Sequence, residues 1–269
     1  MASSEEAVLL LRLAGPIQSW GDRSSFNRRD TRPEPTKSGV IGLLAAASGR
    51  AREDSITDLA ELRLGIRVDQ PGTLLRDYHT ASDYRGRPLP QAGVSKKGVQ
   101  KPTSPPKDTY VTTRFYLQDA VFLAGVAGPR PLLETLDHAV RHPSFPLALG
   151  RRSCVPTQPI SRGLRDGSLG DVLAAEPWLA SEHARAVHER EHRTTLGSWI
   201  SLSATLEDPE HGDDILNDVP RSFDPHHRAF ASRRIRHTWL KVPTGLADAG
   251  NAADTTADAG HDPFALLGW

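Results

Sequence analysis

Residues Thr36-Lys-Ser-Gly39, which follow Pro35, combine a helix-capping hydroxyl with a cationic side chain. A helix that begins at Thr36 would direct unpaired backbone N–H groups outward at its positive end, and such an end binds phosphate or carbonyl oxygens. Lys37 would add a point charge there. Because the Walker pattern is missing from the sequence, this motif gives nucleotide hydrolysis no support. The alternative is an ordinary capped helix.

Two further short segments carry groups that can bind RNA. In Leu75-Arg-Asp-Tyr-His-Thr80, Tyr78 and His79 could stack on bases or act as acid and base. Neighbours on a strand face opposite sides, which favours stacking or core packing over joint catalysis. In Gly150-Arg-Arg-Ser-Cys154 the adjacent arginines suit phosphate or carboxylate binding, although a structural salt bridge would use the same residues. We interpret Cys154 as a small buried residue.

Charge is unevenly distributed along the 269 residues. The 33 Lys and Arg balance 33 Asp and Glu, so the whole protein offers no electrostatic argument for nucleic acid. Residues 76–114 nevertheless carry eight basic and three acidic residues, whereas residues 207–218 contain six acids and no base. Within the basic region, residues 82–107 hold five prolines and predict a mobile insertion or an extended hairpin. Cations beside aromatics suit single-stranded nucleic acid; a solvated loop is the alternative.

A zinc site is the sharpest rival interpretation. His188-Glu-Arg-Glu-His192 matches the H-E-x-x-H pattern of zinc hydrolases. The neighbouring residues are charged and a third ligand is not evident, although Glu207, Asp208 or His211 could be proposed. A solvated helix is therefore favoured, and His226-His227 is a similarly weak metal motif. We predict no metal and no cofactor.

Composition also indicates the cellular compartment of the protein. A single cysteine excludes an intramolecular disulfide and fits a reducing environment. No segment approaches the ~20 apolar residues of a membrane span. The acidic start and the short apolar run after it do not match a secretory signal. We therefore predict a cytoplasmic protein without a membrane partner.

The elements that position these residues follow from hydrophobic patterning. We expect strands at residues 8–13, 62–68, 73–80 and 110–126, and helices at 36–47 and 130–142. Residues 147–149 and those that follow could supply a last strand. This order predicts an α+β fold of the ferredoxin-like βαββαβ type with one elaborated hairpin. Later we expect a turn and a short helix at 166–173, a polar helix at 180–193, strands at 197–206 and 234–242, and a disordered tail.

Four segments, in this order, resemble the CasD (Cas-five) family of the type I-E CRISPR Cascade complex. They are Leu11–Gly21, Pro35–Leu44, Leu75–Thr80 and Leu149–Cys154, with a weaker match at Phe230–Arg233. The resemblance covers residues 7–160 well, and residues 176–229 and those after Pro243 have no clear match. It implies a RAMP protein with an RRM-related ferredoxin-like domain. The expected parts are that domain at 1–155, a thumb hairpin inserted at 81–113, a less regular region at 156–243 and a flexible tail at 244–269.

The resemblance also implies a function in antiviral defence. Such a subunit is non-catalytic, binds the 5′ handle of the CRISPR guide RNA and caps one end of the Cascade backbone. Its implied partners are the guide RNA, the backbone subunit, the large PAM-reading subunit and, indirectly, the target DNA. The residues expected to contact RNA are Gln18, Trp20, Thr36, Lys37, Ser38, Gly39, Arg76, Tyr78, His79, Tyr84, Arg85, Arg114, Arg151, Arg152 and Ser153.

Two other hypotheses remain open. One is a metal-independent endoribonuclease that processes CRISPR RNA through His79, as an equivalent subunit does in a related subtype. The other is a zinc hydrolase acting through His188, Glu189 and His192.

Overall fold

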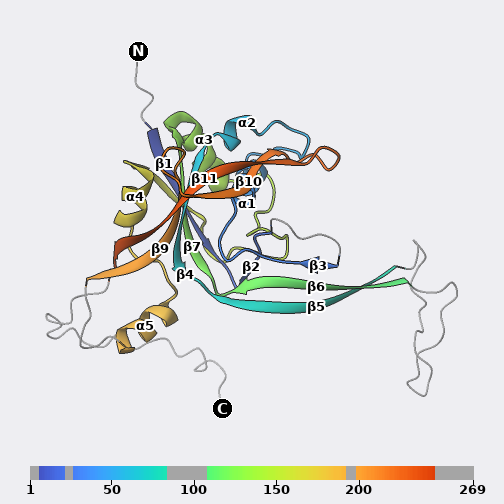
Figure 1. The fold of residues 1–269 in the computed structure, drawn as a ribbon, viewed down its shortest axis with the longest axis horizontal. Coiled ribbons are helices and arrows are strands. Elements are labelled where there is room, and N and C mark those ends of the chain that lie inside the picture. The colour runs from blue at the N-terminus through green and yellow to red at the C-terminus, as the bar shows by residue number, and fades with distance from the viewer. Residues whose placement is uncertain (1–5, 22–26, 84–107, 192–197, 246–269) are drawn as a thin grey trace, which may run out of the picture.

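The computed structural model describes residues 6–21, 27–83, 108–191 and 198–245. This part of the chain is a mixed α+β fold, as predicted. It consists of a seven-stranded antiparallel sheet, a smaller four-stranded sheet and the helices packed around them (Figure 1).

Four strands form one half of the large sheet. In space they follow the order β4-β7-β1-β8, and every neighbouring pair is antiparallel. Their bounds are β1 (Glu6–Ala14), β4 (Arg63–Gln70), β7 (Val121–Pro129) and β8 (Ser161–Asp166). Helix α1 (Lys37–Ala47) and the short α2 (Thr57–Ala60) precede β4, and α3 (Arg130–Arg141) follows β7. When α2 and the strands of the smaller sheet are left out, the connectivity is strand, helix, two strands, helix and strand.

Residues 147–149 do not form the last strand of this unit. The Leu149 N–H donates to the Cys154 carbonyl at 2.7 Å, and the Cys154 N–H donates to the Arg151 carbonyl at 2.8 Å. These bonds close a tight turn in which Gly150 has a φ of 87°, a conformation that favours glycine. Strand β8 instead forms the fourth strand of this unit, at the edge of the sheet next to β1.

Alternation along β1 divides its side chains between two cores. Leu9, Leu11 and Leu13 pack with residues of α1 and α3 on one face. Val8 and Leu10 pack on the other face with residues of α4 (Leu169–Ala175). The expectation of a buried first strand is therefore confirmed, and the strand is covered by helices on both sides.

The C-terminal strands continue the same sheet. Beyond β4 the order is β9, β11 and β10, all antiparallel. Their bounds are β9 (Trp199–Glu207), β10 (Asp214–Ser222) and β11 (Ala229–Pro243), and α5 (Glu182–Glu191) precedes them with no buried residue. The large sheet thus crosses the boundary that we placed after residue 155. Sequence patterning missed β10 because Asn217, Asp218 and Pro220 disfavour a strand.

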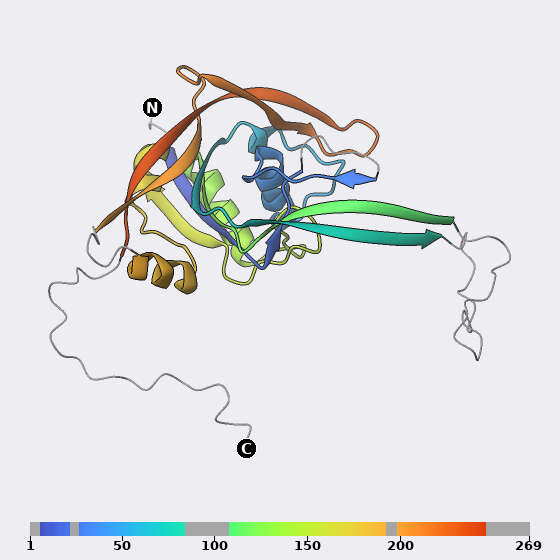
Figure 2. The ribbon, with the colours of Figure 1, turned by 60° about the horizontal axis from the view of Figure 1, so that its bottom comes forward.

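A long hairpin projects from the body of the molecule (Figures 1 and 2). It consists of β5 (Thr73–Asp83) and β6 (Asp108–Gln118), paired from Thr73 opposite Gln118 to Asp83 opposite Asp108. Along its other edge, β6 pairs with β2 (Ile17–Gln18) and, in parallel, with β3 (Arg28–Arg29). Residues 84–107, which include Tyr84 and Arg85, lie outside the described residues.

Two glycines of α1 provide a matched test of how tightly this helix packs against its neighbours. A Cβ added to Gly39 would lie 2.6 Å from Cε3 of the buried Trp20, whereas one added to Gly42 would lie 3.6 Å from Cζ of Phe223. We expect Gly39→Ala to lower the free energy of unfolding by about 1–3 kcal/mol through overpacking. Gly42→Ala should be neutral or stabilise by up to about 1 kcal/mol, because alanine is the better helix former. Urea denaturation measures both; equal effects would contradict this account.

Candidate nucleic-acid interface

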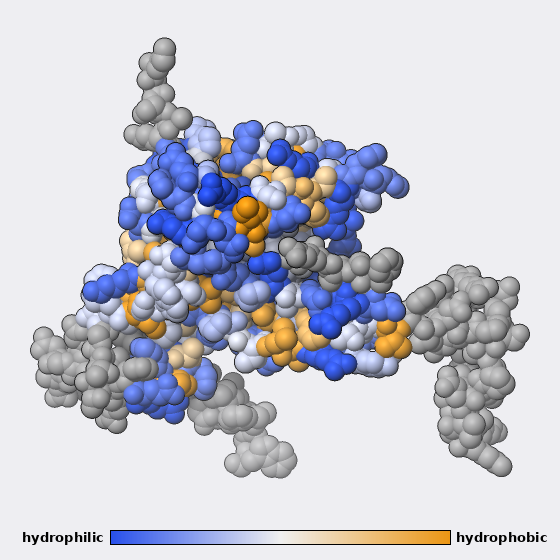
Figure 3. Space-filling view, viewed as in Figure 1, coloured by the Kyte–Doolittle hydropathy of each residue, from blue (hydrophilic) through white to orange (hydrophobic). Residues whose placement is uncertain are grey.

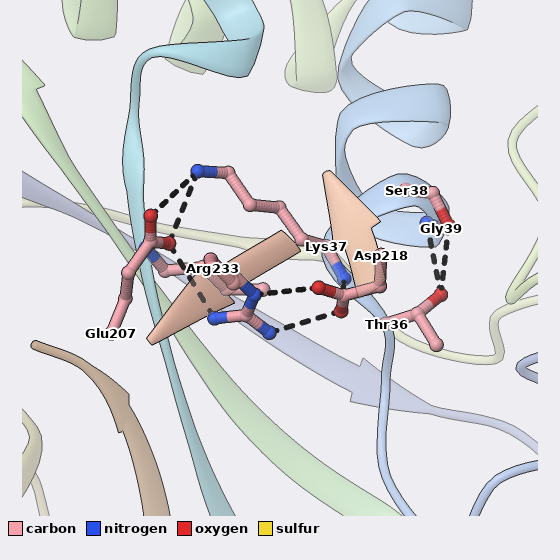
Figure 4. A network of polar contacts seen from close by, with 8 residues as sticks. Thr36, Lys37, Ser38, Gly39, Glu207, Asp218 and Arg233 are labelled. Atoms are coloured by element: carbon pink, nitrogen blue, oxygen red, sulfur yellow. Dashed lines mark hydrogen bonds and ion pairs between the residues drawn. The ribbon is translucent and has the colours of Figure 1, made fainter. Parts of the chain in front are cut away.

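The positive end of α1 is occupied by a carboxylate of the protein itself (Figure 4). Thr36 caps the helix, and its Oγ1 accepts a hydrogen bond from the Gly39 N–H at 3.1 Å. The Lys37 N–H donates to Oδ2 of Asp218, a residue of β10, at 2.7 Å. An acidic side chain thus takes the place at the helix end that the sequence suggested for a phosphate.

The Lys37 side chain is also engaged within the protein. Its Nζ donates to both carboxylate oxygens of Glu207, at 2.9 and 3.1 Å. Arg233 of β11 donates to Asp218 through Nε and Nη2, at 2.7 and 3.0 Å, and its Nη1 lies 3.4 Å from Glu207. We call these four residues the buried ion network. Burial lowers the pKa of Lys37 below its ordinary value, and the Glu207 carboxylate opposes that shift.

Four of the side chains that we predicted to contact RNA lie inside the described structure. Gln18, Trp20, Thr36 and Lys37 are at most 2% exposed. Gln18 Nε2 donates to two backbone carbonyls at 3.0 and 2.7 Å, and Trp20 Nε1 donates to Gln18 Oε1 at 3.1 Å. These side chains hold β1, β2 and α1 together. Ser38 and Gly39 are half-buried at the helix start and remain predicted contacts.

Arg151 ties β3 to the hairpin. Its Nη1 donates to the Phe115 carbonyl at 3.0 Å, its Nη2 donates to the Arg29 carbonyl at 2.7 Å, and its guanidinium lies 4.8 Å from the centre of the Tyr116 ring. These contacts make Arg151 a positioning residue rather than an open phosphate site. Arg152 and Ser153, which follow it in the turn, are exposed.

An exposed surface extends over the hairpin and β3. Arg76 and Tyr78 are exposed on β5, and Tyr78 shows 64% of its surface. Arg28 and Arg29 are exposed on β3, where the Arg28 guanidinium lies 5.0 Å from the centre of the Phe115 ring. Along the hairpin, hydrophobic patches lie beside strongly hydrophilic ones (Figure 3). The exposed apolar side chains there are Leu74, Leu75 and Val111.

Two residues of this hairpin that we predicted to contact RNA are half-buried. His79 is half-buried, and its Nδ1 lies 3.2 Å from Thr112 Oγ1. Arg114 is also half-buried, and its Nε is buried without a hydrogen-bond partner in the described structure. Our residue set omitted Arg28 and Arg29, although the run of arginines between residues 23 and 32 was a visible signal.

Two exposed arginines on or beside this surface have no acidic partner in the part of the chain that the structure describes. Within the described ranges, Arg76 and Arg152 have no carboxylate within ion-pair distance. Arg28 on β3 is paired with Asp30 at 2.8 Å, and several arginines elsewhere are also paired with acids, as in Arg50–Asp58, Arg63–Glu6 and Arg165–Glu176. Unpaired cations contribute more to the local positive potential, so this surface suits a polyanion.

A metal centre finds no support in the described part of the chain. No group of three or more His, Cys, Asp and Glu side chains there could hold a metal ion. His188 packs edge-on against Trp178, with ring centres 5.2 Å apart, and His192 lies outside the described residues.

Cys154 is buried, as expected, and burial raises the pKa of its thiol. Among the described helices, none is long and apolar enough to cross a membrane.

The antiparallel sheet with its projecting hairpin places the protein in a class of α+β subunits found among solved CRISPR proteins. One solved chain comes from a structure described as a CRISPR RNA-guided surveillance complex and is 34% identical to this protein, with a TM-score of 0.66. The match covers 88% of this chain and 91% of that chain. Another, described as the crystal structure of a Cas protein, is 38% identical with a TM-score of 0.62 and coverages of 88% and 98%.

The family follows from the sequence match. The chain belongs to the CRISPR-associated protein family Cas_Cas5, whose model matches residues 8–236. It is similar to the CRISPR system Cascade subunit CasD of Escherichia coli (strain K12), with 35% identity over 192 residues, 65% of this chain and 75% of that protein. The family indicated by the sequence motifs is therefore confirmed, and the match extends beyond residue 160.

The buried ion network yields a stability prediction. We expect Asp218→Ala to lower the free energy of unfolding by about 3–5 kcal/mol, because it leaves the buried Arg233 guanidinium with only its longer contact to Glu207 and the Lys37 N–H without its acceptor. Glu6→Ala, which removes the exposed partner of Arg63, should cost less than about 1 kcal/mol. Urea denaturation of both variants measures the difference. A loss below about 1 kcal/mol for Asp218→Ala would show that the network contributes little.

Proposed function

We propose that this protein is a non-catalytic subunit of a cytoplasmic CRISPR Cascade complex and binds the 5′ handle of the guide RNA. The unit of β1, α1, β4, β7, α3 and β8 would be an RRM-related ferredoxin-like domain, and the β5–β6 hairpin its thumb. At one end of the complex the protein would contact the backbone subunit and the large PAM-reading subunit, and target DNA only indirectly. The similarity to a Cascade subunit supports this proposal.

The observation that carries the proposal is the exposed surface of the hairpin together with the turn after Gly150, which Arg151 connects to β6. Arg76 and Arg152 supply planar donors that match phosphate oxygens, and neither has a carboxylate partner in the described structure. Tyr78, at 64% exposure, offers a ring on which an unpaired base can stack. Phosphate contacts of this kind position a strand, and base contacts then add sequence preference.

A binding measurement tests the surface. We expect Arg76→Ala/Arg152→Ala to weaken binding of the guide RNA by about tenfold and to make the log–log salt slope shallower by about 1.4, since each phosphate contact to a single strand contributes about 0.7. The double variant Arg162→Ala/Arg190→Ala removes two exposed arginines from β8 and α5 and should bind like the wild type. Fluorescence anisotropy across a salt series gives both quantities. Equal losses in the two variants would mean that the hairpin has no special role.

The three functional hypotheses differ in what the purified complex contains and does. We expect one defined short RNA to be recovered with the protein and its neighbouring subunits, and to remain uncut when a chelator is present. Chelator-resistant cleavage that disappears in His79→Ala would instead establish the endoribonuclease. Stoichiometric zinc that is lost in His188→Ala would establish the hydrolase. RNA sequencing and metal analysis of the same preparation distinguish these outcomes.

A further inference from the structure

The β10–β11 hairpin presents a second group of basic side chains. The turn between the two strands carries His226, His227 and Arg228, and Arg221 lies near the end of β10; all four are exposed. Figures 1 and 2 both show this turn on the side of the molecule from which β3 and the β5–β6 hairpin project. Two hairpins that are far apart in the sequence therefore extend toward the same side.

The turn has a defined shape. Asp224 Oδ1 accepts a hydrogen bond from the His226 N–H at 2.8 Å, and the Asp224 N–H donates to Ser222 Oγ at 3.1 Å. Phe223 packs against the main core next to α1 and anchors the base of the turn. The Arg228 guanidinium lies 5.2 Å from the centre of the Phe230 ring. The cationic groups are thus presented on an ordered support, which limits the entropy lost when they bind a ligand.

The charges on this turn are not neutralised locally. Within the described residues, Arg221 and Arg228 have no carboxylate within ion-pair distance. The acid of the turn, Asp224, lies against His227, with Oδ2 and Nδ1 3.3 Å apart. Arg236, which lies further along β11, is by contrast paired with Asp208 at 3.4 Å. The turn therefore adds positive potential to the side that already carries the hairpin arginines.

We propose that the β10–β11 turn is a second RNA-binding arm, in which Arg221 and Arg228 contact phosphates of the strand held by the β5–β6 hairpin. This inference rests on the proposed function. A guanidinium matches the planar arrangement of phosphate oxygens, and the two histidines provide further donors. RNA is favoured over an acidic protein partner because the turn lies on the same side as β3 and the β5–β6 hairpin, whose exposed residues include both cations and an aromatic ring.

Anisotropy with a labelled single-stranded RNA of the sequence recovered from the complex tests this arm on the full-length protein. We expect Arg221→Ala/Arg228→Ala to weaken binding by about tenfold and to reduce the salt slope by about 1.4. Arg221→Lys/Arg228→Lys keeps the charge and should retain most of the slope while it loses the bidentate geometry. Arg162→Ala/Arg190→Ala is the matched control, and thermal melting confirms that every variant is folded.

The outcomes separate this inference from the proposed function. If Arg76→Ala/Arg152→Ala weakens RNA binding while Arg221→Ala/Arg228→Ala equals the control, the second arm is refuted and the proposed function stands. If the wild-type protein binds no RNA, both fail together. If Arg221→Ala/Arg228→Ala binds RNA normally but assembles poorly with neighbouring subunits, the turn contacts a protein partner, which also overturns the inference.

Discussion

A buried network of four charges joins the first helix to the last three strands. Removing charges from water is costly, and pairing offsets this cost only when the geometry is good and the remaining donors are satisfied. Here Lys37 meets Glu207, Arg233 meets both acids, and Asp218 also accepts the first N–H of α1. One set of bonds therefore determines where α1 begins and how β9, β10 and β11 lie against it (Figure 4).

Arginine has two separate uses in this protein. Inside the protein it binds backbone: Arg67 is fully buried, pairs with both carboxylate oxygens of Asp69, and donates to one carbonyl within α4 and two just after it. Arg151 does the same for β3 and β6. Outside, Arg76 on the hairpin and Arg152 in the turn after Gly150 are exposed. Composition alone could not separate these uses, because both exploit the same planar group of donors.

The candidate site was only partly predictable. The exposed positions Arg76 and Tyr78 lie on a strand whose pattern was visible in the sequence. The sequence could not show which anion Lys37 binds, because a cation at the start of a helix suits a phosphate and a carboxylate equally well. Its carboxylate partners, Glu207 and Asp218, lie 170 and 181 residues further along the chain, where no local pattern connects them. The sequence therefore showed which residues have the chemistry to bind RNA, but not which of them are exposed.

The sequence by itself determined the α+β class, the main strands and helices and the family, because periodic burial and short motifs are local properties of the chain. Tertiary structure alone decided that β8 completes the four-strand unit, that β9 to β11 extend the same sheet, and which cations are turned inward. The physical reason is that strand pairing and charge burial depend on residues distant in the chain. Their free energies are settled only when the whole sheet assembles.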